Sequence, residues 1–141
     1  MNLSAPARPI AAPPTVAALL TCAAIHQDDT RKAYLLGVFN GFQSAAYPAT
    51  MPRLCLYLAL TDGHGPTPLV VRLIDAADEF APPLFAFDIP PVRFGSPLDV
   101  KEVAVEVPAV ALPRPGLYRW QVLCGGEVLH ERRLAAARIG G

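Results

Sequence analysis

The sequence has no excess of positive or negative charge, and it has no long apolar run. Twelve Lys and Arg residues balance twelve Asp and Glu residues over 141 positions. The excess of positive charge that steers proteins to nucleic acid is therefore absent. No apolar run reaches the ~18 residues that a membrane-spanning helix needs. We expect no binding to nucleic acid or membrane, and one domain with a substantial core, because 52% of the residues are hydrophobic.

A recognisable secretory signal is also missing. Met1–Ala24 matches one poorly, because prolines fill its middle. The three cysteines, Cys22, Cys55 and Cys124, are an odd number and fit reduced thiols that pack in a core. Both observations favour the cytoplasm.

The sequence contains none of the spacings that bring metal ligands or catalytic groups together. No C-x₂-C or H-x₃-H pair occurs, so we interpret the cysteines and the three histidines (His26, His64 and His130) as structural. Cys22 with His26 could act as nucleophile and base only with an exposed thiol of lowered pKa, and an apolar strand raises that pKa. We assign no catalytic residue, metal ligand or cofactor, and we do not expect a small-molecule ligand.

Two polar stretches could bind a cation or a phosphate, but each has a simpler interpretation. Residues 26–30 (HQDDT) offer oxygen ligands, yet paired Asp residues between strands are ordinary turn chemistry. The stretch 62–65 (DGHG) is too short for a phosphate-binding loop, and no helix follows it. We therefore interpret both stretches as turns.

Proline is abundant, with sixteen residues that fall mostly in clusters. Proline breaks helix interiors and central strands, so the clusters predict connections and exclude long helices. The clusters are Pro6, Pro9, Pro13 and Pro14; Pro82 and Pro83; Pro90 and Pro91; and Pro113 and Pro115. Residues 1–14, rich in Ala and Pro, predict a disordered or polyproline-II-like arm.

Apolar runs with strand-like alternation lie between these connections. Thr15–Ile25 is predicted to be a central strand, Asn40–Arg53 a loop, and Leu54–Asp75 a hairpin of two strands. In Val100–Val107, valine alternates with Glu and Ala, as in a strand with one wet face. Gly125-Gly126 predicts a two-residue turn, because glycine adopts the positive φ of type I′ turns. The other predicted strands are Ala33–Phe39, Leu84–Ile89, Gly116–Cys124 and Glu127–Ala135.

These elements predict an all-β, single-domain, antiparallel β-sandwich of the immunoglobulin-like kind, over residues 15–137. We expect seven or eight strands, with a β-barrel as the competing architecture. Tyr118 and Trp120 share a face with Val122 and Cys124, so we place them in the core rather than on a ligand platform. Residues 138–141 are expected to form a flexible tail.

Two passages resemble a known family. They are VAALLTCAAIHQDDTRKAYLLGVFNGF (residues 16–42) and PGLYRWQVLCGGEVLHERRL (residues 115–134). They are similar to a bacterial domain of unknown function, the DUF6941-type proteins, which open with a hydrophobic strand ending in cysteine and close with a Pro-Gly-x-Tyr-Arg-Phe hairpin. The sequence departs from that pattern at Ala23-Ala24, where the family tends to carry an acidic residue. The resemblance implies a sandwich and no catalytic residues.

The leading functional hypothesis is a non-catalytic module that binds another protein or self-associates. Leu54–Thr61 has apolar side chains on both faces of the predicted strand. It is the candidate interaction surface, with Leu54, Leu56, Tyr57 and Leu58 as its residues. A second hypothesis is a protein modifier conjugated through Gly140 and Gly141, although no central amphipathic helix of a β-grasp modifier is found. A third is an enzyme whose site the sequence does not show.

Overall fold

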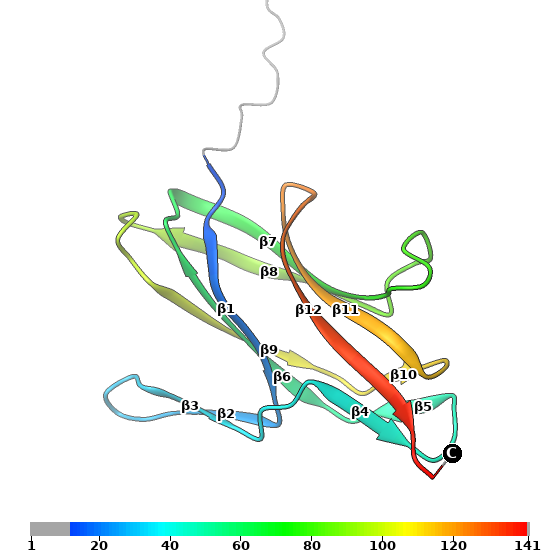
Figure 1. Ribbon diagram of the computed structural model, residues 1–141. Helices are drawn as coiled ribbons and strands as arrows, with labels where there is room; N and C mark the ends of the chain where they lie inside the picture. The colour runs from blue at the N-terminus through cyan, green and yellow to red at the C-terminus, as the bar shows by residue number, and fades with distance from the viewer. Residues whose placement is uncertain (1–11, 141) are drawn as a thin grey trace, which may run out of the picture.

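A computed structural model describes residues 12–140 as two packed β-sheets (Figure 1). The three-stranded sheet has the order β1 (Thr15–Cys22), β6 (Leu54–Thr61), β9 (Lys101–Val107). The five-stranded sheet has the order β4 (Gly41–Ser44), β12 (Glu127–Arg138), β11 (Gly116–Cys124), β7 (Gly65–Asp75), β8 (Phe85–Phe94). Two further pairs are β10 (Val110–Leu112) with β5 (Ala49–Met51), and β2 (Ala24–Gln27) with β3 (Ala33–Leu36). The all-β prediction is confirmed.

The strand count and some pairings differ from expectation. The described residues form twelve strands rather than seven or eight, because short strands lie in stretches predicted as loops or as parts of longer strands. The predicted loop Asn40–Arg53 holds β4 and β5, and β4 pairs with β12 in parallel. No helix occurs between residues 12 and 140, and so none there could cross a membrane.

The predicted hairpin Leu54–Asp75 is wrong. Its two strands lie in different sheets: β6 pairs with β1 and β9, whereas β7 pairs with β11 and β8. The connecting turn takes positive φ at Asp62 (60°) and Gly65 (63°). Gly63 lies so close to the Phe94 ring that an added Cβ would come within 2.2 Å of it. This packed corner carries the chain across the sandwich instead of folding it back in plane.

Two further strand assignments need correction. Thr15–Ile25 is not a central strand, because β1 lies at the edge of its sheet and ends at Cys22. The cluster Pro90-Pro91 does not mark a connection but lies inside β8. Since β8 is the edge strand of its sheet, a residue without an N–H can be accommodated there.

The core lies between the two sheets and is built on alternate residues of each strand. The inward side chains of β6 and β9 meet those of β7 and β11, and Trp120 is completely buried among them. Val103, Val105 and Val107 point inward as predicted, and Glu102, Ala104 and Glu106 are exposed. The core position predicted for Tyr118 and Trp120 is confirmed.

The ends of the chain lie only partly within the described residues. The predicted arm, residues 1–14, falls outside them up to Ala11, and Pro14 is buried. In the predicted tail, Arg138 still belongs to β12, and the Ile139 N–H donates to the Ser44 carbonyl at 2.9 Å. Gly140 is exposed, and Gly141 lies outside the described residues.

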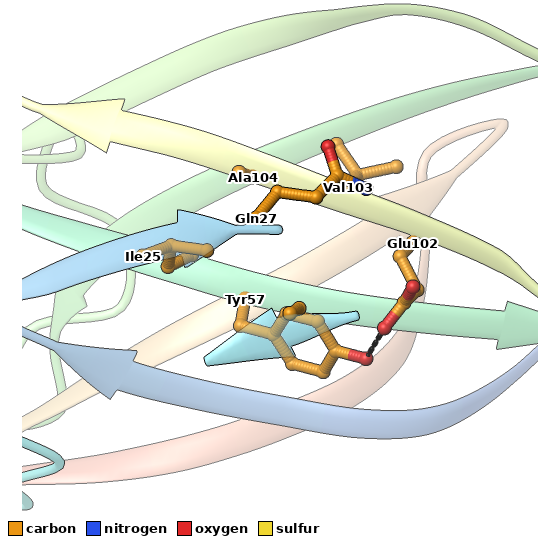
Figure 2. Close-up of a pocket in the computed structure, with 7 residues that line it drawn as sticks. Ile25, Gln27, Tyr57, Glu102, Val103 and Ala104 are labelled. Atoms are coloured by element: carbon orange, nitrogen blue, oxygen red, sulfur yellow. Dashed lines mark hydrogen bonds between the residues drawn. The ribbon is translucent and has the colours of Figure 1, made fainter. Parts of the chain in front are cut away.

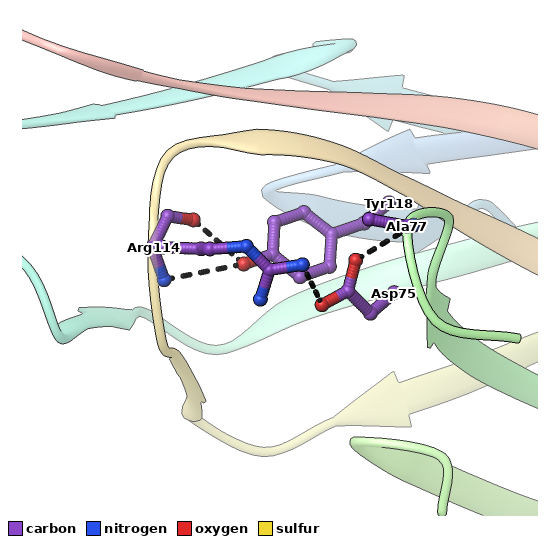
Figure 3. A network of polar contacts seen from close by, with 4 residues as sticks. All are labelled: Asp75, Ala77, Arg114 and Tyr118. Carbon is purple, nitrogen blue, oxygen red and sulfur yellow. Dashed lines mark hydrogen bonds and ion pairs between the residues drawn. The ribbon is translucent and has the colours of Figure 1, made fainter. Parts of the chain in front are cut away.

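A tyrosine locks the entry to β11 (Figure 3). Tyr118 is 1% exposed, and its hydroxyl donates to the Arg114 carbonyl at 2.6 Å. The Arg114 guanidinium in turn pairs with Asp75 at 2.6 Å, and the other Asp75 oxygen accepts from the Ala77 N–H at 2.9 Å. Burial raises the pKa of Tyr118, which keeps the hydroxyl a donor. A tyrosine that bonds back to the preceding backbone is a feature of immunoglobulin-type sandwiches.

Tyr118→Phe tests this contact. Removing the hydroxyl leaves the Arg114 carbonyl without its donor, so the free energy of unfolding should fall by about 1–3 kcal/mol. Urea denaturation followed by tryptophan fluorescence measures the change. An unchanged unfolding midpoint would show that the hydrogen bond contributes nothing.

The predicted turn between β11 and β12 is confirmed. Gly125 and Gly126 have φ of 59° and 82°, as a type I′ turn requires. An added Cβ at Gly126 would touch nothing within 4 Å, so a substitution there acts through the backbone alone.

We therefore expect Gly126→Val to lower the free energy of unfolding by about 1–2 kcal/mol, because a β-branched residue resists the left-handed conformation. Gly126→Asn is the matched control, since asparagine tolerates that conformation, and it should cost less. Thermal or urea unfolding of the two variants decides the point; equal losses would contradict the strain argument.

Candidate functional site

The four residues predicted to form an interaction surface separate in the structure. Leu54, Leu56 and Leu58 are 3%, 0% and 0% exposed and belong to the core. The folded domain cannot present them to a partner, so that part of the prediction is corrected. Tyr57 points the other way and lies, partly exposed, on the outer face of the three-stranded sheet. Both faces of β6 are apolar because the second face borders another element of the fold.

That element is the hairpin β2–β3, which extends from the end of β1 at one side of the sandwich (Figure 1). Its strands pair with each other and with no other strand of the described chain. Alternate side chains of the hairpin face opposite ways. Ile25, Gln27 and Ala33 border a hollow shared with β6 and β9, and the other set, which includes Tyr34 and Leu36, is exposed to solvent.

The carboxylate of Asp28 holds the tip of this hairpin together. One oxygen accepts from the Thr30 N–H (2.8 Å), the Thr30 hydroxyl (2.7 Å) and the Lys32 N–H (2.9 Å). The other accepts from the Tyr34 hydroxyl at 2.9 Å. These hydrogen bonds, with that from the Thr30 side chain the largest, lower the pKa of Asp28 to about 2. The stretch predicted as a turn is thus a turn that its first aspartate organises.

The exposed side of the hairpin is apolar. Tyr34 and Leu36, at alternate positions of β3, are 46% and 55% exposed, and Val38, which follows the end of the strand, is 50% exposed. His26 stands across the hairpin from Tyr34, with ring centroids 6.2 Å apart. We name Tyr34 and Leu36, which share this side of β3, the hairpin face; Val38 follows the break in the strand at Gly37. Two large apolar side chains on one side of a projecting element form an exposed patch of the kind found at interaction sites.

The hollow behind the hairpin combines apolar walls with one carboxylate (Figure 2). It measures about 190 Å³ and lies between the hairpin and the outer face of β6 and β9. Tyr57 donates its hydroxyl to the carboxylate of Glu102. Burial, and then Glu102 itself, raise the pKa of Tyr57 to about 12, so the phenol stays a donor near neutral pH. Its lining residues are Ile25, Gln27, Ala33, Tyr57, Glu102, Val103 and Ala104.

The cysteines and histidines do not converge. Cys22 and Cys124 are buried, and burial raises the pKa of both thiols, as expected for Cys22 on an apolar strand. His26 lies exposed on the hairpin, His64 in the turn between β6 and β7, and His130 on β12. Between residues 12 and 140, no three His, Cys, Asp or Glu side chains come together as metal ligands would.

Comparison with known proteins places the chain in a family. The family of unknown function DUF6941 matches residues 17–137. The chain belongs to this family. The resemblance seen in the sequence is thereby confirmed. The family match spans nearly all of the residues that form the DUF6941 domain described above.

Two other comparisons add little. No curated protein matches the chain. Among solved structures, it is similar to the crystal structure of an immunoglobulin-like protein from Pseudomonas aeruginosa, with 15% identity, a TM-score of 0.38, and coverage of 90% of this chain and 94% of that chain.

Sequence reasoning missed the hairpin face and the hollow. Residues 33–39 are predicted to form one strand. Gly37, with φ of 69°, ends that strand after Leu36. Glycine inside a strand often marks a bulge or a close backbone approach, so Gly37 is the sequence signal for this break. The hollow joins residues far apart in sequence and has no such signal.

The Asp28 contacts predict how the hairpin responds to acid. The folded pKa lies below the ordinary value of 3.8, so the stabilisation by Asp28 is fully present above that value and is lost as pH falls through about 2. In a pH titration by NMR, the amide signals of Thr30 and Lys32 should move with a midpoint near 2.

Asp28→Asn should abolish this transition, and Asp29→Asn, which alters the neighbouring exposed carboxylate, should preserve it. A midpoint near 3.8 in the unaltered protein would show that the four hydrogen bonds do not hold the carboxylate in solution.

Proposed function

We propose that this DUF6941 domain is a non-catalytic module that binds another protein, or a second copy of itself, through the hairpin face. The observation that carries the proposal is the pair Tyr34 and Leu36, each about half exposed on one side of a hairpin that projects from the sandwich (Figure 1). Burying such side chains against a partner gains roughly 25 cal/mol per Å² of apolar surface.

Two features of the hairpin support a binding role. Asp28 bonds to its turn and to Tyr34, so the face is ordered before any partner arrives, and a preorganised surface loses less entropy on binding. The outer edges of β2 and β3 also pair with no other strand of the described residues. An extended segment of a partner can pair with such an edge.

Site-specific photocrosslinking tests the proposal. A photoreactive phenylalanine analogue is placed at Leu36, in the full chain, in the cells that make the protein. Val128 is the control position, because it is also a partly exposed apolar residue but lies on β12, in the five-stranded sheet. We expect a discrete adduct at position 36, either with another protein or with a second copy, and none at position 128.

Leu36→Ser should abolish that association, with little change in the free energy of unfolding, because the residue is more than half exposed and lies outside the core. Val128→Ser should leave association intact. The absence of any adduct at position 36, or the same adducts at both positions, would contradict the proposal.

A further inference from the structure

We infer that the hollow between the hairpin and the three-stranded sheet is a binding pocket for an arginine side chain of the partner protein. That the arginine belongs to a protein rests on the proposed function above. The pocket itself rests on its own geometry: hairpin residues form one wall, and β6 and β9 residues form the other.

The hollow carries one negative charge. Glu102 is its one charged lining residue, and no Lys or Arg lines it. Throughout residues 12–140, Glu102 makes no ion pair, whereas Glu106, two pleats along the same face of β9, pairs with Arg53 at 3.4 Å. One Glu102 oxygen accepts from the Tyr57 hydroxyl, and the other has no donor in the same range. The hollow therefore offers a free acceptor with negative charge to a cationic group.

The walls of the hollow are largely apolar. The apolar parts of Ile25, Ala33 and Ala104, together with the Tyr57 ring, suit the methylene stem of a long side chain. A tyrosine ring also attracts a cation placed over its face. Both features favour a long cationic side chain over a free metal ion, which would need several oxygen ligands.

The arrangement of acceptors in the hollow favours arginine over lysine. Gln27 lines the hollow from the hairpin, and its amide nitrogen donates to the Arg31 carbonyl at 3.3 Å, which leaves the amide oxygen as an acceptor. The hollow thus has two acceptors on different elements, one on Gln27 and one on Glu102. A guanidinium presents several donors in one plane, stacks on aromatic rings and is less strongly hydrated than an ammonium group.

The location of the pocket fits a partner bound at the hairpin face. Both lie on β2 and β3, on opposite sides of the same two-stranded ribbon. A partner segment that wraps the edge of this ribbon could contact Leu36 on one side and place an arginine behind it on the other.

Titration of the isotopically labelled full chain with N-acetyl-arginine amide tests the pocket. We expect saturable NMR shifts at the amides of Ile25, Tyr57 and Ala104, and none with N-acetyl-citrulline amide, which has a similar shape without the charge. Glu102→Gln should weaken binding by about tenfold or more, because it removes a charge-assisted hydrogen bond. Glu106→Gln, the matched control on the same face, should change affinity by less than about twofold.

Equal shifts with the citrulline compound, no saturable shift, or undiminished binding by Glu102→Gln would overturn the assignment. These outcomes are separate from the crosslinking result at Leu36. An adduct at position 36 without arginine binding would refute the pocket and leave the proposed binding function in place. Arginine binding without an adduct would refute the binding function and leave a cation pocket of this chemistry.

Discussion

The burial of β6 on both of its edges and on one complete face is the constraint on which the rest of the structure depends. The strand is hydrogen-bonded to β1 and β9, and Leu56, Leu58 and Leu60 are fully buried. Their side chains meet Trp120 and its neighbours from the opposite sheet. With no water on that face and no free edge, β6 fixes the spacing of the two sheets and the register of the strands beside it.

Because the inner face of β6 is buried in the core, an interaction of this strand must use its outer face or the hairpin beside it. Two features lie on the outer face of β6: the hydrogen-bonded pair Tyr57 and Glu102, and the hairpin β2–β3. The strands of the hairpin pair only with each other among the described residues, and its turn is held by the hydrogen bonds of Asp28. The molecule thus combines a tightly packed sandwich with a small, separately organised ribbon. That division supports assigning stability to the sandwich and binding to the ribbon.

The sequence predicted those features that depend on neighbours in the chain. The Gly125-Gly126 turn and the alternation of Val103 to Val107 follow from local residue chemistry and are confirmed. Pairing between distant segments was predicted less well. The expected β6–β7 hairpin fails because its loop crosses between sheets, and no local pattern distinguishes a crossing loop from a returning one.

The candidate site was predicted poorly for the same reason. The doubly apolar pattern of β6 was read as a possible surface, and only Tyr57 lies on one. An apolar residue on a strand faces either a core or a partner, and its type alone does not distinguish them. Pairing Tyr57 with Glu102 needs a register that a single sequence does not specify.

Native-state hydrogen exchange tests the central claim most directly, namely that a cooperative sandwich centred on β6 carries a hairpin that opens independently. The account predicts that amides of β6 exchange only through global unfolding, so that their opening free energy matches the free energy of unfolding. Amides of Ala24 to Leu36 in the hairpin should open locally at much lower free energy and with no denaturant dependence. Equal protection of the hairpin and β6, with the same denaturant dependence, would contradict the account.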